Sequence, residues 1–157
     1  MLKVGDQVFI SGYGAGIVIE IDYKKFLDIN QKYIIIYLIV DDMDLLIPEC
    51  KISSYKIREV VDKNILESAL NLIKQEAGII ELNWSKRYRK NKSKIAKGDI
   101  FEMCEVIRDL KTLKDKGVLP LGEEKILDKA IKMVVSETML LLGISEADAR
   151  SLIINNE

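Results

Sequence analysis

The hydrophobic pattern of the chain changes near residue 60, and this change constrains the fold more than any other feature. Before it, short runs rich in β-branched and aromatic residues alternate with segments that contain glycine, aspartate or proline, which is typical of strands and turns. After it, hydrophobic residues recur at the three- and four-residue spacing of amphipathic helices. The sequence therefore predicts an α+β protein in which a β-rich module precedes a helical bundle.

The first module is expected to contain four short strands, at residues 7–10, 17–22, 32–39 and 44–47. Residues 25–31 are interpreted as a loop or hairpin tip, and Pro48 suits the end or edge of a strand. The glycines at 12, 14 and 16 favour a turn or bulge; a strand follows them rather than a helix, which argues against a phosphate-binding loop. Strands at this spacing predict a small, strongly bent sheet or partial barrel.

Five helices are expected. The first covers residues 64–76, the second follows the cap Asn83 through the basic stretch, and the third runs from the cap Asp99 to near Gly117. The fourth covers residues 123–142, and a short final helix opens with the capping box at 145–148. We place the boundary between the modules near residues 60–63, with domains at 1–61 and 62–157. Each domain is small for a self-sufficient core, so the two should share an interface.

The side chains available exclude much catalytic and metal chemistry. The chain has no histidine, so neither a Ser-His-Asp triad nor a Cys-His pair can form. Cys50 and Cys104 lie far apart and are expected to be two buried free thiols rather than zinc ligands. Asp41, Asp42 and Asp44 lack the spacing of a calcium loop. We predict a protein that is not an enzyme and that has no cofactor, metal site or small-molecule substrate.

The longest apolar runs are far shorter than the roughly 20 residues that a membrane helix needs. The N-terminus also lacks the apolar core and cleavage site of a signal peptide. We therefore expect a cytoplasmic protein without a membrane partner.

Charge is strongly segregated along the chain. Residues 82–98 hold seven basic residues and no acidic one, although the formal net charge of the whole chain is −1. A basic stretch on an otherwise acidic body predicts a localised contact with a polyanion. The only tryptophan, Trp84, begins this stretch and could wedge against a base where a duplex is distorted. Alternatively, Trp84 is a core residue and the lysines form a solvated helix face.

Two further features admit two interpretations each. The strand at 44–47 could be a free sheet edge that accepts a partner strand, or an ordinary strand. Arg108 could bind a ligand, but a structural ion pair with Asp109 and Glu105 is favoured.

Several motifs together resemble one family. The first module is similar to the start of the CarD/CdnL family of bacterial transcription regulators. The similarity lies in Val4-Gly5-Asp6-x-Val8, Gly14-Ala15-Gly16, Ile47-Pro48 and Arg58-Glu59-Val60. The same Tudor-like module occurs as the polymerase-interacting domain of the transcription-repair coupling factor. In the second module, Asn83-Trp84-x-x-Arg87-Tyr88, Lys97-Gly98-Asp99 and residues 106–110 match further family motifs.

The resemblance implies a function with two partners. The Tudor-like module would bind the β subunit of RNA polymerase, through Lys24 and the edge residues Asp44, Leu45, Leu46, Ile47 and Pro48. The helical module would contact promoter DNA at the upstream edge of the bubble, largely without sequence specificity, and stabilise the open complex. Trp84 would be a wedge in the minor groove, and the basic residues Lys86, Arg87, Arg89, Lys90 and Lys125 would hold phosphates. The protein would associate with the nucleoid through polymerase.

The chain departs from the family at three places. Residues 11–14 lack the usual Pro-x-His-Gly pattern. Basic residues that often face polymerase align with Lys24, which keeps the charge, and with Leu46, which does not. Glu123 and Glu124 precede Lys125 at the start of a helix that tends to be basic. An alternative function, a protein-interaction adaptor that uses only the β module, follows if these departures have changed the partner.

Overall fold

The computed structural model of the protein describes residues 1–154, so residues 155–157 at the end of the predicted helical domain lie outside it. The β module, residues 1–61, contains β1 (Gln7–Ile10), β2 (Gly14–Phe26), β3 (Ile29–Leu38), β4 (Met43–Pro48), the 3₁₀ helix η1 (Glu49–Ser54) and β5 (Ile57–Glu59). The helical module, residues 62–154, contains α1 (Lys63–Lys74), α2 (Trp84–Lys97), α3 (Ile100–Asp115), α4 (Leu121–Leu142) and α5 (Glu146–Ile154). The predicted α+β class is confirmed.

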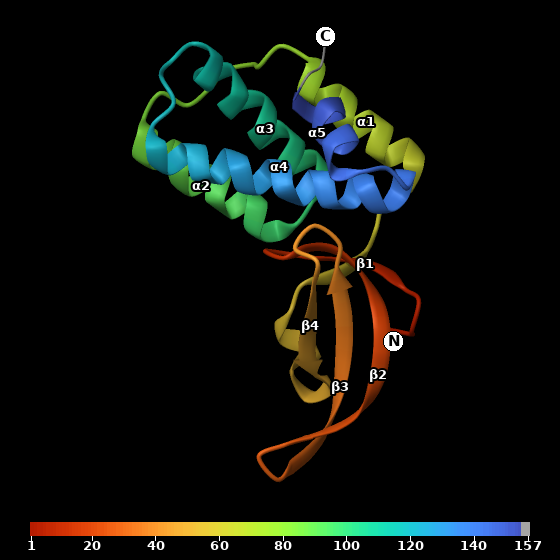
Figure 1. The fold of residues 1–157 in the computed structure, drawn as a ribbon. Coiled ribbons are helices and arrows are strands. Elements are labelled where there is room, and N and C mark those ends of the chain that lie inside the picture. The colour runs from red at the N-terminus through yellow and green to blue at the C-terminus, as the bar shows by residue number, and fades with distance from the viewer. Residues whose placement is uncertain (155–157) are drawn as a thin grey trace.

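The sheet is antiparallel and open, with strand order β4-β3-β2-β1-β5. It projects from one side of the helical module (Figure 1). One face buries a core of its own, in which Val18, Ile36 and Ile47 are almost fully covered and η1 adds Ile52. Of the two predicted sheet forms, the structure shows the bent sheet, with a register shift between Val18 and Glu20.

The β2–β3 hairpin is longer than the sequence indicated. Most of the segment interpreted as a loop, 25–31, is paired strand, and only Leu27 and Asp28 form the turn. Both have positive φ, 48° and 64°, as a two-residue turn that matches strand twist requires. The segment carries neither glycine nor an Asn-Gly pair, so the usual sequence signal for such a tight turn is missing.

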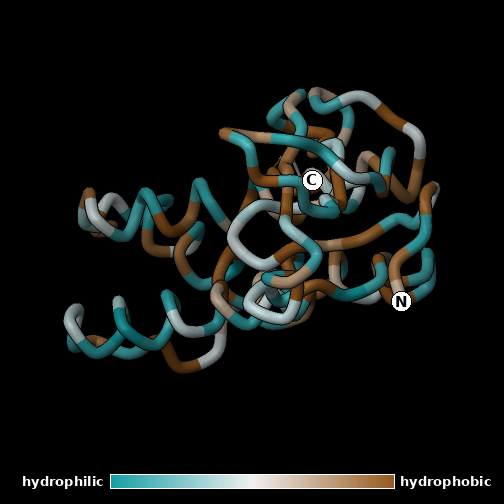
Figure 2. Tube along the Cα trace, turned by 90° about the horizontal axis from the view of Figure 1, so that it is seen from below, coloured by the Kyte–Doolittle hydropathy of each residue, from teal (hydrophilic) through white to brown (hydrophobic). Residues whose placement is uncertain are grey.

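The helices pack around α3, whose residues Met103, Val106, Ile107 and Leu110 are fully buried. The predicted caps are confirmed: the side chains of Asn83, Asp99 and Ser145 accept hydrogen bonds from backbone N–H groups three residues on. Hydrophilic and hydrophobic residues alternate along the helices, as amphipathic helices require (Figure 2).

The β2 strand begins against α4, and this contact explains the glycine-rich segment. Phe9 and Ala15 belong to the helical core rather than the sheet core. The Ala15 N–H donates to the buried Ser136 Oγ at 2.8 Å. Gly14 has φ +104°, and a Cβ there would lie 2.9 Å from that oxygen. Glycine is therefore needed both for backbone conformation and for the close approach of α4.

A buried carboxylate on α4 joins the two modules more strongly. Glu137 is fully buried and accepts two hydrogen bonds from Arg58 of β5, at 2.7 and 2.8 Å. It also accepts the Val61 N–H at 2.9 Å, while Arg58 Nε donates to the Gly98 carbonyl and its guanidinium lies 4.4 Å from the centre of the Phe9 ring. The expected interface between the modules is thus a packed, hydrogen-bonded junction.

Replacing Glu137 with glutamine should destabilise the protein by about 3 kcal/mol, because Arg58 loses its counter-charge in a buried setting but keeps some access to water. Urea denaturation measures this free energy of unfolding. The matched control is Glu146→Gln, which removes an exposed pair with Arg150 within α5 and should cost at most about 0.5 kcal/mol. Equal losses in the two variants would contradict a structural role for the junction.

Candidate nucleic-acid and polymerase interfaces

Trp84 is the first residue of α2, directly after the cap Asn83. Its side chain is 65% exposed, so the interpretation of Trp84 as a core residue does not hold. Leu82, in the segment that leads into the helix, is 90% exposed as well. A large aromatic side chain left in solvent at a helix end is available to a partner.

An ion pair beneath α2 fixes the position of its first turn. Arg87 Nε and a terminal nitrogen of its guanidinium donate to the two carboxylate oxygens of Glu123 on α4, at 2.6 and 2.7 Å. The third guanidinium nitrogen donates to the Glu81 carbonyl at 2.9 Å. The hydrogen bond to Glu123 raises the pKa of Arg87 above its ordinary value, which favours the charged guanidinium.

This pair changes the role expected for Arg87. Arg87 and Glu123 are 7% and 1% exposed, and both ends of the pair are hydrogen-bonded. The guanidinium is therefore not free to hold a phosphate, contrary to the sequence-based expectation. Glu123, which in the sequence is only a departure from a basic helix start, is the partner that Arg87 requires.

The remaining basic residues of α2 divide into two groups. Lys94 and Lys97 pair with Glu105 and Glu102 of α3. Lys86, Arg89, Lys90 and Lys92 are exposed and, within residues 1–154, have no carboxylate partner. The structure thus leaves three of the predicted phosphate contacts available on the same helix as Trp84.

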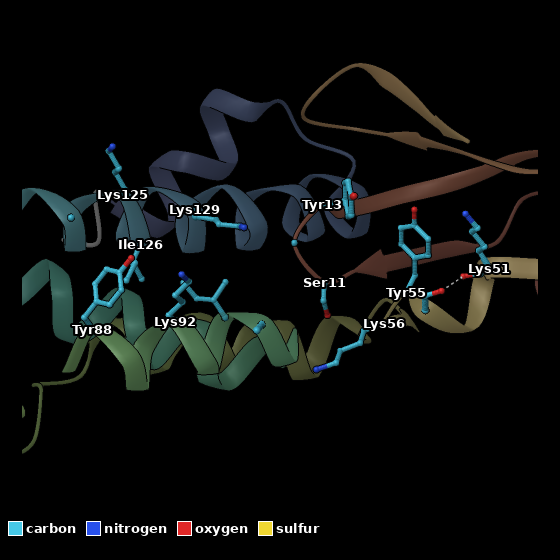
Figure 3. A pocket seen from close by; sticks show the side chains of 15 residues that line it. Ser11, Tyr13, Lys51, Tyr55, Lys56, Tyr88, Lys92, Lys125, Ile126 and Lys129 are labelled. Carbon is cyan, nitrogen blue, oxygen red and sulfur yellow. Dashed lines mark hydrogen bonds between the residues drawn. The ribbon is translucent and has the colours of Figure 1, made fainter. Parts of the chain in front are cut away.

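Lys125 lies on α4, two residues beyond the buried Glu123, and is exposed. It lines a cleft together with Tyr88 and Lys92 of α2 (Figure 3). The tertiary packing of α2 on α4 therefore brings Lys125 near the basic helix, although the residues are more than 30 positions apart in the sequence.

Five of the six predicted polymerase-binding residues, Asp44 to Pro48, occupy one edge of the sheet, on β4. Strand β4 pairs only with β3 among the described residues, so its outer side is a free edge. Ile47 is buried in the sheet core, whereas Asp44 and Leu46 are exposed and Leu45 and Pro48 are half-buried. Because β strands alternate, Leu46 lies on the face opposite the sheet core, paired with Ile35.

Lys24 lies on the same face of the sheet as Leu46. Ile35 pairs with both Leu46 and Glu20, and Lys24 forms a 3.2 Å ion pair with Glu20 four residues earlier on β2. The structure therefore brings Lys24 and Leu46 to one surface, but the charge of Lys24 is balanced by Glu20.

The remaining candidates for chemistry have structural roles. Arg108 pairs with Asp109 at 2.9 Å as expected, but Glu105 pairs with Lys94 instead. No group of three or more acidic or cysteine side chains that could hold a metal ion occurs among residues 1–154. No helix in this part of the chain is both long and apolar enough to cross a membrane.

The prediction of two buried thiols is confirmed for Cys104 and wrong for Cys50, which is exposed at the start of η1. Burial raises the pKa of the Cys104 thiol to about 12. Because only the thiolate reacts readily, a thiol reagent at pH 8 should modify Cys50 in the folded protein and both cysteines in denaturant. Counting released chromophore per chain checks this, and a Cys50→Ser variant that still reacts quickly when folded would contradict it.

Comparison with known proteins identifies both modules. Residues 2–61 match the CarD-like/TRCF RID domain, and residues 68–154 match the CarD C-terminal domain. The chain is 35% identical over 151 residues to the protein named "Putative transcription factor YdeB" from Bacillus subtilis (strain 168), covering 96% of this chain and 99% of that protein. The chain therefore belongs to the CarD family of transcription factors, which are not enzymes, and its β module is an RNA polymerase-interacting domain.

Proposed function

We propose that this protein docks on the β subunit of RNA polymerase through the edge strand β4 and places Trp84 against promoter DNA at the upstream edge of the bubble, stabilising the open complex. The observation that carries the proposal is Trp84 itself, an exposed aromatic side chain at the start of a helix, near Lys86, Arg89 and Lys90, which have no carboxylate partner among residues 1–154. A regulator of this kind works in the cytoplasm, on the nucleoid.

The chemistry of this helix start suits a distorted duplex. Lys86, Arg89 and Lys90 can neutralise phosphates, which gives affinity without sequence specificity. An aromatic side chain can insert where base pairs are unstacked and so slow closure of the bubble. Arg87 supports this arrangement from within the protein, because its pair with Glu123 holds the first turn of α2 on α4.

The docking edge suits a partner strand or an apolar surface. A free edge offers backbone hydrogen-bonding groups, and Leu46 adds an apolar side chain where a basic residue often stands in the family. Since Lys24 is already paired with Glu20, the contact with polymerase would depend less on charge.

The junction at Glu137 makes the two surfaces act together. With the sheet fixed on α4, docking of β4 on polymerase would hold Trp84 at one position relative to the promoter. Such tethering raises the effective concentration of DNA at α2, so weak and nonspecific DNA contacts suffice.

Replacing Trp84 with alanine should leave folding and polymerase binding unchanged but shorten the lifetime of open complexes about tenfold, because stacking of one base contributes about 1–3 kcal/mol. Competitor-challenge decay of promoter complexes measures the lifetime, and Trp84→Phe should restore part of it. Leu82→Ala, which removes a neighbouring exposed apolar side chain, is the control. An unchanged lifetime for Trp84→Ala, with the protein bound, would exclude the wedge.

Replacing Leu46 with aspartate should weaken binding to an isolated β-subunit lobe fragment at least tenfold, because it places a charge in an apolar contact. Titration calorimetry measures the affinity. Leu152→Asp, at a similarly exposed leucine on α5, is the matched control and should have no effect. If the folded protein shows no saturable binding at all, the adaptor function with another partner takes precedence.

A further inference from the structure

A cleft of about 940 Å³ lies between the two modules. Its walls are the β1–β2 turn and η1 on one side and α2 and α4 on the other (Figure 3). The contacts between the modules, which include the junction at Glu137 and the Ala15–Ser136 hydrogen bond, hold the two walls together. Its lining comes from four separate parts of the chain, so no local sequence motif marks it.

The charged residues that line this cleft are all basic. Among residues 1–154, no aspartate or glutamate lines the cleft, and five lysines do: Lys51, Lys56, Lys92, Lys125 and Lys129. None of the five forms an ion pair within the described part of the chain. By contrast, seven lysines elsewhere do pair with carboxylates: Lys24, Lys25, Lys32, Lys94, Lys97, Lys114 and Lys132.

This distribution points to an anionic ligand. The chain has 25 acidic residues and 24 basic ones, so counter-ions are plentiful, yet none lines the cleft. Like charges that line one cleft repel one another, and a chain of phosphates would relieve that repulsion. Lys125 and Lys129 are one helical turn apart on α4, about 6 Å along its axis, which suits successive phosphates of one ligand.

Aromatic side chains alternate with the lysines around the cleft. Tyr13 and Tyr55 stand on the β-module side with ring centres 6.1 Å apart and tilted by 43°, and Tyr88 stands on the α2 side. Tyr13 is exposed, whereas Tyr55 and Tyr88 are half-buried and pack partly against the hydrophobic cores. Lys92 Nζ lies 5.7 Å from the centre of the Tyr88 ring, and both side chains are visible in Figure 3. A basic groove that presents aromatic side chains is the combination that binds unpaired nucleic-acid strands, because bases stack on the rings.

The cleft begins one helical turn beyond Trp84, the residue proposed to contact DNA at the start of α2. Trp84, Tyr88 and Lys92 are spaced by four residues and so follow one face of the helix, with Trp84 at its start and Lys92 in the cleft. A strand that leaves the duplex at Trp84 can therefore run along α2 into the cleft.

We infer that the cleft binds a short stretch of single-stranded DNA, and that the β module contributes to this contact through Lys51 and Lys56. The inference rests on the proposed function, since the strand in question is one released at the upstream edge of the bubble. The volume fits a few nucleotides of one strand and is too small for a duplex. The polymerase-interacting module would then hold DNA as well as polymerase, on separate surfaces.

Fluorescence anisotropy of the full-length protein with a labelled oligothymidylate of about ten nucleotides tests the inference, over a series of salt concentrations. The double variant Lys51→Gln/Lys56→Gln should bind several-fold more weakly. A plot of the logarithm of the association constant against the logarithm of salt concentration has a negative slope. The variant should make that slope less steep by about 1.4, which is about 0.7 for each phosphate that it no longer neutralises. The control Lys63→Gln/Lys74→Gln removes the same charge from exposed positions on α1, outside the cleft, and should leave the slope unchanged.

Three results would overturn the inference. The first is equal weakening by the two double variants, which would show a general charge effect. The second is an equal reduction of the slope with duplex DNA, which would exclude a single-strand site. The third is complete competition by an equimolar nucleoside triphosphate, which would make the cleft a small-nucleotide pocket.

The test is independent of the proposed wedge. Lys51 and Lys56 lie outside β4 and α2, so polymerase binding should persist in their double variant. If Trp84→Ala has no effect on open complexes but the cleft variant loses single-strand affinity, the wedge fails and the cleft stands. The reverse pattern would leave the wedge and remove the cleft.

Discussion

The rest of the structure depends on the ion pair between the buried Glu137 and Arg58. The Glu137 carboxylate is buried on α4 and satisfied by Arg58 and by the Val61 N–H, at the point where the chain passes from sheet to helices. A buried ion pair contributes little net stability compared with apolar packing, but it is costly to break, so it enforces one geometry. Here that geometry fixes the distance between the β4 edge and the basic helix.

A second buried pair has a similar effect on a smaller scale. Arg87 and Glu123 join α2 to α4, and they orient the helix so that Trp84 remains in solvent while the following turn is anchored. Charges that a sequence suggests as ligand contacts thus divide into two kinds. Those that find a carboxylate inside the protein shape the site, and those left without one are available to phosphates.

Much of the fold could be predicted because its determinants are local. The β-branched run at 32–39 and the caps Asn83 and Asp99 specify strand and helices through neighbouring residues alone. The same local reasoning was wrong for Cys50, and it made the hairpin loop at 25–31 too long. It also assigned Arg87 to DNA. For Arg87 the deciding partner, Glu123, lies on another helix. The tight turn at Leu27 and Asp28 lacks the glycine that usually marks it, and Cys50 is exposed although cysteine is usually buried.

The sequence by itself determined the order of the modules, the basic stretch beginning at Trp84 and the family, because periodicity, charge and motif are properties of contiguous residues. Only the tertiary structure decided which cations are free, which strand is an edge, and that Lys51 and Lys56 line one cleft with Lys92 and Lys125. The physical reason is that counter-ion pairing and burial depend on contacts between elements: the Arg87–Glu123 and Arg58–Glu137 pairs join residues 36 and 79 positions apart, which meet only when α4 packs against α2 and the sheet.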